Sequence, residues 1–216
     1  MTTQPRSFAA LMPVKLATHG KSRLAALGDP AREQLVLAFA LDTISALLEA
    51  PSVALVAVVT DDIEVALACR ELGAEAIPDG GDELNDSLVQ AAAEVSRRHP
   101  DLCLMAVVGD LPTLDPVSVE EASAAFDGEP MAFVPDAAGH GTTAYLAASY
   151  SDFSPRFGSG SAEAHRSSGA HELDLPGDCP LREDVDTPEE LERARGRLGA
   201  HTRLALTQLG LEPGLR

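Results

Sequence analysis

VALVAVV (residues 53–59) and LCLMAVV (residues 102–108) are two stretches of strand length that carry no charged or amide side chain. A strand that is apolar on both faces is typical of a parallel sheet covered by helices on both sides. Amphipathic stretches of helix length lie between and around these two strands. The sequence therefore predicts an α/β fold, a three-layer α/β/α sandwich whose central sheet is mostly parallel.

The same alternation of apolar and amphipathic stretches continues outward from these two strands. Further strands are expected at residues 8–14, 74–77 and 131–134. Helices are expected at residues 30–50, 62–72, 84–98, 116–126 and 189–198. No linker or repeat interrupts the chain, so we expect a single domain. Its core covers residues 8–198, and a C-terminal tail covers 199–216, loosely held from about Leu204.

The composition excludes several classes of protein. The chain has 216 residues, a net charge of −18 and 45% hydrophobic residues, which argues against nucleic acid or an anionic membrane as a partner. No apolar run is long enough to span a bilayer, and the N-terminal segment is expected to be a strand and not a signal peptide. The three cysteines lack metal spacing, which indicates reduced thiols in a cytoplasmic protein.

In open α/β sheets, ligands bind beyond the carboxyl ends of the strands, so the polar residues that directly follow the strands matter most. Lys15 follows the first expected strand, Thr60 and Asp61 follow the second, and Asp110 follows the strand at residues 102–108. We therefore expect these side chains to border the binding site.

The only lysines of the chain, Lys15 and Lys21, lie in one segment that also contains Arg23. The triplet GKS at residues 20–22 does not complete a P-loop, because Lys15 occupies the position of the first required Gly. Cations clustered in a strongly acidic chain suit a polyphosphate, on which an ammonium group acts as a compact point charge. The alternative is a solvated basic turn.

Three aspartates are candidate metal ligands. Asp110 lies in GDLP (residues 109–112) at the binding edge, where a carboxylate can hold Mg²⁺ together with the phosphate oxygens of a substrate. Asp184 and Asp186 are two residues apart in an expected strand, so their carboxylates share one face and need a cation or solvent. The alternatives are a turn or helix cap at Asp110, and a helix start or exposed surface at Asp186.

Two loops rich in glycine could approach a ligand closely. RFGSGS (residues 156–161) runs into a short helix with Ser161 as expected N-cap, and backbone N–H groups at a helix start bind phosphate or carboxylate. GHGTT (residues 139–143) offers the hydroxyls of Thr142 and Thr143. Either segment could also be an ordinary flexible loop. The six histidines show no metal-ligand spacing and are expected at the surface or in loops.

Taken in order, these segments resemble the guanylyltransferases of the deazaflavin coenzyme F-420 pathway. The matching pieces are Lys15 with KSRL at residues 21–24, GDLP at 109–112, GT at 141–142, RFGSGS at 156–161 and DVDTP at 184–188. They span about residues 8–198, and their joint order and spacing are more specific than any single piece. The resemblance implies a nucleotide-diphospho-sugar transferase-like fold of the Rossmann-like type, shared with molybdenum-cofactor guanylyltransferase.

The resemblance also implies an activity. An enzyme of this family transfers GMP from GTP to phosphoenolpyruvate or 2-phospho-L-lactate and releases pyrophosphate. With phosphoenolpyruvate the product is enolpyruvyl-diphospho-guanosine. The resemblance implies that Asp110 and Asp186 hold Mg²⁺, with Asp184 assisting. It further implies that the phosphorylated acid is contacted by Lys15, Thr142, Gly158 and Ser161. This chain departs from the family at Thr143, where Asn is frequent, so Thr143 is a looser candidate for the same contact.

The remaining candidates follow from the chemistry of nucleotidyl transfer. Lys21 and Arg23 are expected to stabilise the leaving pyrophosphate. Thr60 and Asn85, in the loops after the second and third strands, are expected near the nucleotide base. The residues alone do not decide between phosphoenolpyruvate, phospholactate and phosphoglycerate, because these acids differ by a few atoms. The resemblance to the Arg-rich, acidic bacterial members of the family implies phosphoenolpyruvate.

Three other functions compete with this reading. Molybdenum-cofactor or sugar-phosphate nucleotidyl transfer uses the same fold, although the sugar enzymes usually have a longer glycine-rich loop before the lysine. A non-catalytic module that only binds a nucleotide is the alternative from another class, and the retained Asp110 and Asp186 argue against it. A nicotinamide-dependent oxidoreductase is disfavoured because no GxGxxG pattern is completed.

Overall fold

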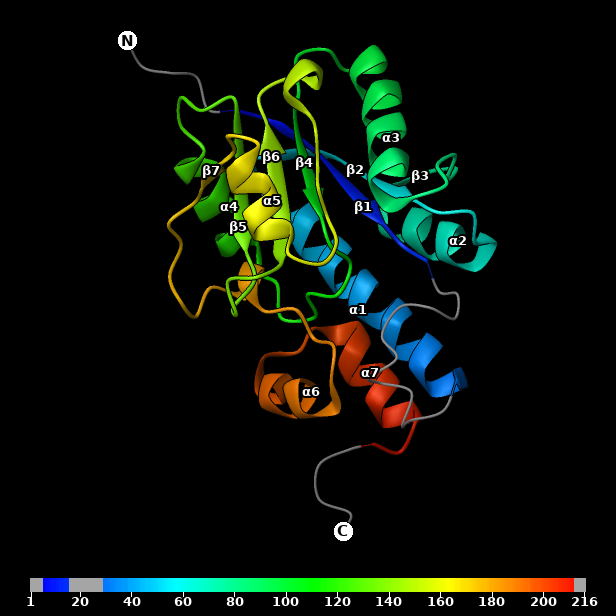
Figure 1. The fold of residues 1–216 in the computed structure, drawn as a ribbon. Helices are drawn as coiled ribbons and strands as arrows, with labels where there is room; N and C mark the ends of the chain where they lie inside the picture. The colour runs from blue at the N-terminus through cyan, green and yellow to red at the C-terminus, as the bar shows by residue number, and fades with distance from the viewer. Residues whose placement is uncertain (1–5, 16–28, 212–216) are drawn as a thin grey trace.

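The computed structural model describes residues 6–15 and 29–211 of the chain (Figure 1). Two of the expected catalytic residues, Lys21 and Arg23, lie outside the described residues. Within the described ranges, strands and helices alternate along most of the chain, as the pattern of apolar and amphipathic stretches predicts. No helix among the described residues is both long and apolar enough to cross a membrane.

The described strands form one sheet of seven strands in the order β3-β2-β1-β4-β6-β5-β7. Neighbouring strands are parallel except β6, which is antiparallel to both β4 and β5. The sheet is therefore mostly parallel, as expected. The strands are β1 (Phe8–Pro13), β2 (Val53–Val59), β3 (Glu75–Ile77), β4 (Cys103–Val107), β5 (Met131–Pro135), β6 (Thr142–Ala147) and β7 (His171–Glu172).

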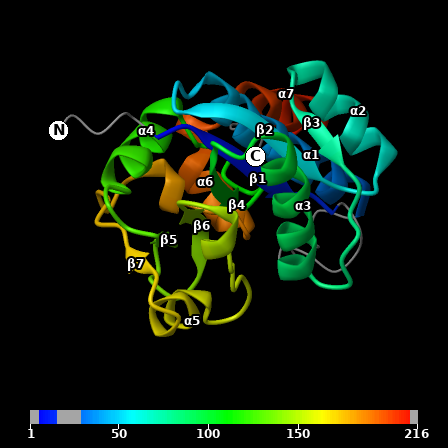
Figure 2. The ribbon, with the colours of Figure 1, turned by 90° about the horizontal axis from the view of Figure 1, so that it is seen from above.

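Helices cover both faces of this sheet, as Figure 2 shows from above. The α-helices are α1 (Asp29–Glu49), α2 (Ile63–Leu72), α3 (Leu84–Arg98), α4 (Pro116–Ala125), α5 (Ser161–Ser167), α6 (Pro188–Ala194) and α7 (Ala200–Gln208). The 3-10 turns are η2 (Tyr150–Asp152), η3 (Pro180–Arg182) and η4 (Arg195–Arg197).

The alternation of side chains along β1 shows how the two faces are filled. Phe8, Ala10 and Met12 pack with residues of α1, α2 and α4, whereas Ala9 and Leu11 pack with residues of α3 and α5. All five side chains are completely buried. A strand buried on both faces must be apolar throughout, which is why continuous apolar stretches predicted the layered fold.

Several element bounds agree with the sequence-based prediction. β2 and α3 begin and end at the predicted residues, and the other predicted strands up to residue 135 differ by one residue at their ends. Local chemistry explains the sharp limits of α2. The Asp62 carboxylate accepts hydrogen bonds from the backbone N–H groups of Glu64 and Val65, and Gly73 ends the helix in the left-handed conformation with φ +104°.

The loosely held tail expected from about Leu204 is wrong as far as Gln208. These residues belong to α7, which packs against α1 and buries Thr202, Ala205 and Leu206. The cap of α7 comes from a distant residue. The buried Asp42 carboxylate of α1 accepts hydrogen bonds from the backbone N–H groups of His201 (2.8 Å) and Thr202 (2.9 Å).

Candidate functional site

Asp110, Asp184 and Asp186 converge beyond the carboxyl end of β4. One carboxylate oxygen from each lies within 4.8 Å of the others, and all three side chains are half-buried. We call these three residues the carboxylate wall. Residues 110 and 184 are far apart in the chain, and their backbones are joined by a hydrogen bond from Val185 N–H to the Asp110 carbonyl (3.0 Å). The expected grouping of the three aspartates is therefore present in the structure.

The strand expected around Asp184 and Asp186 is wrong, because residues 183–186 form no strand. The two carboxylates share a side because Val185 between them is anchored in the core, with 2% of its surface exposed. α6 then starts directly after Asp186. Thr187 is its N-cap, and the Glu190 carboxylate accepts from the backbone N–H groups of Asp186 and Thr187, both at 2.9 Å. The helix start at this position, considered as an alternative to metal binding, therefore coexists with the cluster.

The carboxylate wall carries an electrostatic cost. Burial, together with the negative charges of Asp110, Asp186 and Asp136, raises the pKa of Asp184 to about 7. Like charges at such distances favour protonation or the arrival of a cation. Three oxygen donors spaced within 4.8 Å fit a hard divalent ion such as Mg²⁺, which holds its ligands about 3–4 Å apart.

Two of the cavities that border this wall adjoin each other. The first cavity has a volume of about 310 Å³, and its lining includes Thr142, Gly158 and Ser161. The second cavity, about 380 Å³, has a lining that includes Lys15 and Gly109. Their linings share Leu84, Val108, Asp110 and Asp186. The carboxylates thus stand where two ligands in adjacent cavities could meet.

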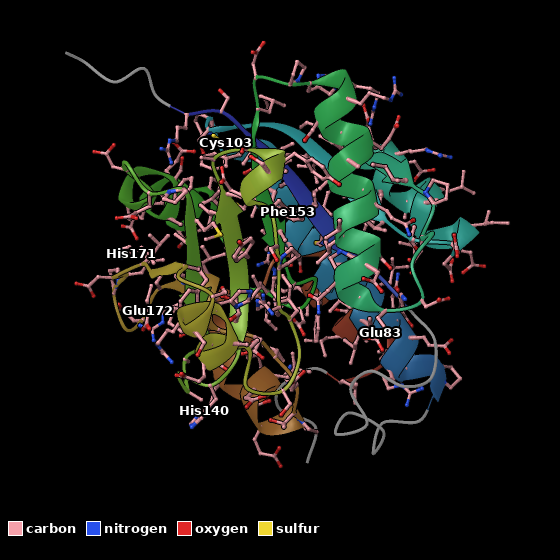
Figure 3. The ribbon with its side chains drawn as sticks, turned by 45° about the horizontal axis from the view of Figure 1, so that its top comes forward. Glu83, Cys103, His140, Phe153, His171 and Glu172 are labelled. Carbon is pink, nitrogen blue, oxygen red and sulfur yellow. The ribbon has the colours of Figure 1, made fainter. Side chains whose placement is uncertain are left out.

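Figure 3 helps to locate this edge of the sheet. Cys103, the first residue of β4, lies in the upper part of the view, whereas His140 lies in the lower part and Glu83 at the right, below the middle. The sequence neighbours of the last two residues, Leu84 and Gly141, line the first cavity. The cavities therefore open at the carboxyl end of the parallel strands, where open α/β sheets bind their ligands.

His165 contacts Thr142, one of the residues that line the first cavity. The ring is completely buried and stacks against Phe133 and Tyr145 at centroid distances of 5.4 and 4.9 Å. Its Nε2 accepts a hydrogen bond from Arg156 N–H (2.9 Å), and its Nδ1 lies 2.9 Å from Thr142 Oγ1. We call Thr142 and Ser161, together with His165 buried behind Thr142, the hydroxyl wall.

The expectation that every histidine lies at the surface or in a loop is wrong for His165. Burial lowers its pKa to about 4, although the nearby Ser161 carbonyl opposes that shift, so the imidazole is neutral at neutral pH. Ser161 is not the N-cap of α5, because Gly160 occupies that position without a side-chain cap. Ser161 is instead the first helical residue and is 2% exposed.

Asn85 fastens the loop that carries Gly158. Its Nδ2 donates to the Phe157 carbonyl (3.0 Å), and its Oδ1 accepts from Phe157 N–H (2.8 Å). Both functional groups of the Asn85 amide are engaged in this way. Gly158 itself has φ +135°, a conformation in which a side chain is strained. The loop is therefore positioned from two sides, by Asn85 on α3 and by His165 on α5.

Lys15 lies on the second cavity and not beside the other predicted acceptor contacts. Its ammonium group forms an ion pair with Asp79 (2.8 Å), whose side chain is 7% exposed. Burial raises the pKa of Asp79, but hydrogen bonds from Lys15, Ser87 and the Gly81 backbone outweigh burial and hold it below its usual value. The ion pair fixes a cation at the mouth of the second cavity.

The structure brings together some of the predicted residues and separates others. Thr143 lines the first cavity beside Thr142, and both residues begin β6 instead of lying in a loop. Thr60 is buried, and its hydroxyl accepts from Asp62 N–H (3.1 Å) at the start of α2.

Sequence reasoning missed the roles of two residues. His165 could have been found from the i, i+1, i+4 spacing with Ser161 and Ala162, which places three residues on one buried helical face. Asp136 also lines the first cavity, and its carboxylate accepts from the backbone N–H groups of His140 (2.9 Å) and Gly141 (2.8 Å). No local pattern indicates Asp136, because its role depends on a turn that closes around it.

The cysteines agree with the expectation of reduced thiols. Cys69, Cys103 and Cys179 are all free and buried. Burial raises the pKa of each thiol, to about 11 for Cys69, so these groups stay protonated and unreactive at neutral pH.

Residues 8–175 match the model of a family described as guanylyl transferase CofC like. A phosphoenolpyruvate guanylyltransferase of Thermomonospora curvata is 42% identical over 200 residues, which cover 92% of this chain and 87% of the relative. A protein of the same name from Streptomyces scabiei is 43% identical over 214 residues, covering 96% of this chain and 99% of the relative.

The fold is also found among solved structures. A protein of Desulfovibrio desulfuricans G20, described as a nucleotide-diphospho-sugar transferase, superposes with a TM-score of 0.67 at 18% sequence identity. The superposition covers 94% of this chain and 96% of that protein. At this identity the likeness concerns the fold alone, and it confirms the nucleotide-diphospho-sugar transferase-like architecture expected from the sequence.

Proposed function

The chain belongs to the CofC-like guanylyl transferase family, and we propose that it transfers GMP from GTP to phosphoenolpyruvate in a Mg²⁺-dependent reaction that releases pyrophosphate. The names of the relatives support the choice of acceptor, since the chain covers nearly all of their length. The free buried thiols suit a reducing cytoplasm, where we place the enzyme.

One observation carries this proposal: the carboxylate wall lies at the junction of two cavities. Nucleotidyl transfer needs two anionic substrates held close together, with charge neutralisation between them. We assign the first cavity to the phosphorylated acid, because the hydroxyl residues Thr142 and Ser161 and the glycines Gly141 and Gly158 line it. We assign the second cavity to the nucleotide, because the ammonium group of Lys15 borders it, and this assignment replaces the contact with the acid that the resemblance implied for Lys15.

In the proposed reaction, a phosphate oxygen of the acid attacks the α-phosphorus of GTP. The new P–O bond forms as the bond from the α-phosphorus to the bridging oxygen breaks, and the electron pair leaves with pyrophosphate. The attacking phosphate is already ionised at neutral pH, so the chain need not supply a general base. Its residues contribute positioning and charge, as in phosphoryl transfer generally.

The residues divide this work between them. Asp110 and Asp186, with Asp184 beside them, would hold Mg²⁺. When bound, the ion supplies positive charge where the phosphates of the two substrates approach each other. Thr142 and Ser161 orient the acid, and Lys15 offsets the negative charge of the nucleotide.

Pyrophosphate release tests the proposal directly. Purified protein with Mg²⁺ is given GTP or ATP together with phosphoenolpyruvate, 2-phospholactate or 3-phosphoglycerate. We expect release with GTP and phosphoenolpyruvate, loss of release when Mg²⁺ is chelated, and a product whose mass equals GMP joined to the acid. Release with GTP and only another acid would overturn the acceptor assignment. Absence of release with all pairs, in folded protein with Mg²⁺, would overturn the activity.

A further inference from the structure

We infer that His165 is a positioning residue that forces the Thr142 hydroxyl to donate its hydrogen bond into the first cavity. The inference rests on the proposed function, because it assigns the group that orients the acid. His165 does not line the cavity and cannot touch a ligand there, so it acts through Thr142.

The first step is the position of the ring proton. Nε2 of His165 lies 2.9 Å from the backbone nitrogen of Arg156, which can only donate. A ring nitrogen that accepts from N–H has no proton of its own. The imidazole is neutral, as its lowered pKa also indicates, so its single proton resides on Nδ1.

The second step is the direction of the bond to Thr142. A protonated Nδ1 cannot accept a hydrogen bond, so Thr142 Oγ1, at 2.9 Å, can only accept from it, and the Ser161 carbonyl is a second acceptor for the same proton. The hydroxyl then keeps its own hydrogen for another acceptor. Among the described residues, Thr142 Oγ1 has His165 as its only hydrogen-bond partner. Thr142 is 6% exposed and lines the first cavity, so its hydrogen is available to a ligand there.

The third step is the chemistry of the ligand. A hydroxyl restricted to donating favours an oxygen that only accepts, such as that of a phosphate or an ionised carboxylate. Without His165, the hydroxyl could rotate and accept, and the site would lose its selectivity for an anion. The ring cannot turn over to exchange its nitrogens freely, because it stacks between Phe133 and Tyr145. The orientation of one hydroxyl hydrogen is thus set by the aromatic core.

A nuclear magnetic resonance experiment reads the proton directly. Long-range ¹H–¹⁵N correlation on protein with ¹⁵N-labelled histidine distinguishes protonated from unprotonated ring nitrogens. We expect His165 to show a protonated Nδ1 and an unprotonated Nε2 from pH 6 to 8. The opposite tautomer, or a doubly protonated ring, would overturn the inference whatever the enzyme's activity.

A double-mutant cycle tests the action through Thr142. His165→Gln keeps an acceptor for Arg156 N–H but removes the protonated Nδ1 that faces Thr142, and Thr142→Val removes the hydroxyl at nearly constant shape. Each single change should raise the KM for phosphoenolpyruvate about tenfold, the effect of one hydrogen bond to a charged group, and leave the KM for GTP unchanged. The double variant should be no worse than the worse single variant.

Control variants distinguish a failure of the proposed function from a failure of the inference about His165. His171→Gln makes the same substitution at an exposed histidine and should change neither constant. Thermal unfolding of each variant establishes that it folds. If Thr142→Val leaves the acceptor KM unchanged, the placement of the acid in the proposed function is wrong and the inference falls with it. Thr142→Val could raise the KM for phosphoenolpyruvate while the double variant shows the sum of both single effects. In that case the two residues act independently, and only the inference is overturned.

Discussion

The two walls of the first cavity are built on opposite principles. The carboxylate wall brings three acidic groups within 4.8 Å, and the pKa of Asp184 is raised to about 7 by burial and by its neighbours' charges. The hydroxyl wall contains neutral groups whose partners are supplied by the protein, such as His165 between Arg156 and Thr142. The carboxylate wall destabilises the folded chain when no cation is bound. The hydroxyl wall has its hydrogen-bond partners within the folded chain. Substitutions should therefore affect the walls differently.

The largest effect is expected from the carboxylate wall. Asp110→Asn keeps the size of the side chain but removes a charge that we assign to Mg²⁺ binding. The rate of pyrophosphate release should fall about a hundredfold or more. Circular dichroism should show that the fold is retained. Asp174→Asn, at an exposed aspartate outside both cavities, is the matched control and should keep its rate. A near-normal rate in Asp110→Asn would remove Asp110 from the site.

The loop that carries Gly158, another part of the first cavity's lining, should respond with lost stability. Asn85→Ala removes two hydrogen bonds to Phe157 and should lower the free energy of unfolding by about 1–2 kcal/mol. Because that loop carries Gly158, the KM for the acid should rise more than the KM for GTP. Urea denaturation and steady-state kinetics measure both effects, with Gln90→Ala on the exposed side of α3 as control. A rise in the GTP constant alone would instead support the sequence-based assignment of Asn85 to the nucleotide.

The carboxylate wall should show the opposite change in stability. Without metal, Asp184→Asn removes a charge that is unfavourable in the folded state, so unfolding should require about 1 kcal/mol more at pH 8. The sign follows from the raised pKa, because ionisation of Asp184 in the folded protein costs more than in the unfolded chain. Thermal unfolding in chelator measures the difference. A destabilised variant would contradict the contrast between the walls.

The smallest effect is expected in the pH dependence of stability. The folded pKa of His165 is about 4, below the ordinary value of 6.5, so the unfolded chain binds a proton first as pH falls. The stabilising contribution is full above pH 6.5 and is lost towards pH 4. His165→Gln should reduce the slope of stability against pH in this window by up to about one proton. His171→Gln should retain most of the slope of stability against pH. Equal slopes in the His165→Gln and His171→Gln variants would contradict the lowered pKa of His165.

The sequence predicted the layered core well because its signals are local. β2 is apolar over its whole length, and α2 has its cap Asp62 and its terminal Gly73 within the same short segment. A ligand site at the carboxyl end of β4 could also be predicted from the sequence, because the rule that ligands bind there needs only the position of the strand. The position of Asp110 at this edge therefore follows from the sequence alone, whereas its role in binding a metal stays a prediction.

The sequence predicted the rest poorly because the deciding partners are distant. α7 is capped by Asp42, 159 residues before His201, so its own sequence shows no start signal. The position of Asp184 depends on a hydrogen bond between Val185 and Asp110 and not on strand formation. The role of His165 depends on the rings of Phe133 and Tyr145, which belong to other elements. Periodicity cannot indicate such partners.

The place of β6 in the sheet has a consequence for the chain as it is synthesised. β6 separates β4 from β5, although β5 is made before it, and β5 pairs only with strands that follow it among the described residues. The nascent chain can therefore assemble β1 to β4 while the backbone N–H and C=O groups along one edge of β4 are still unpaired. That open edge favours association with other unfinished chains until the β5–β6 hairpin closes it. Residues 184–186 are made later still, so the carboxylates assemble only after the sheet is closed.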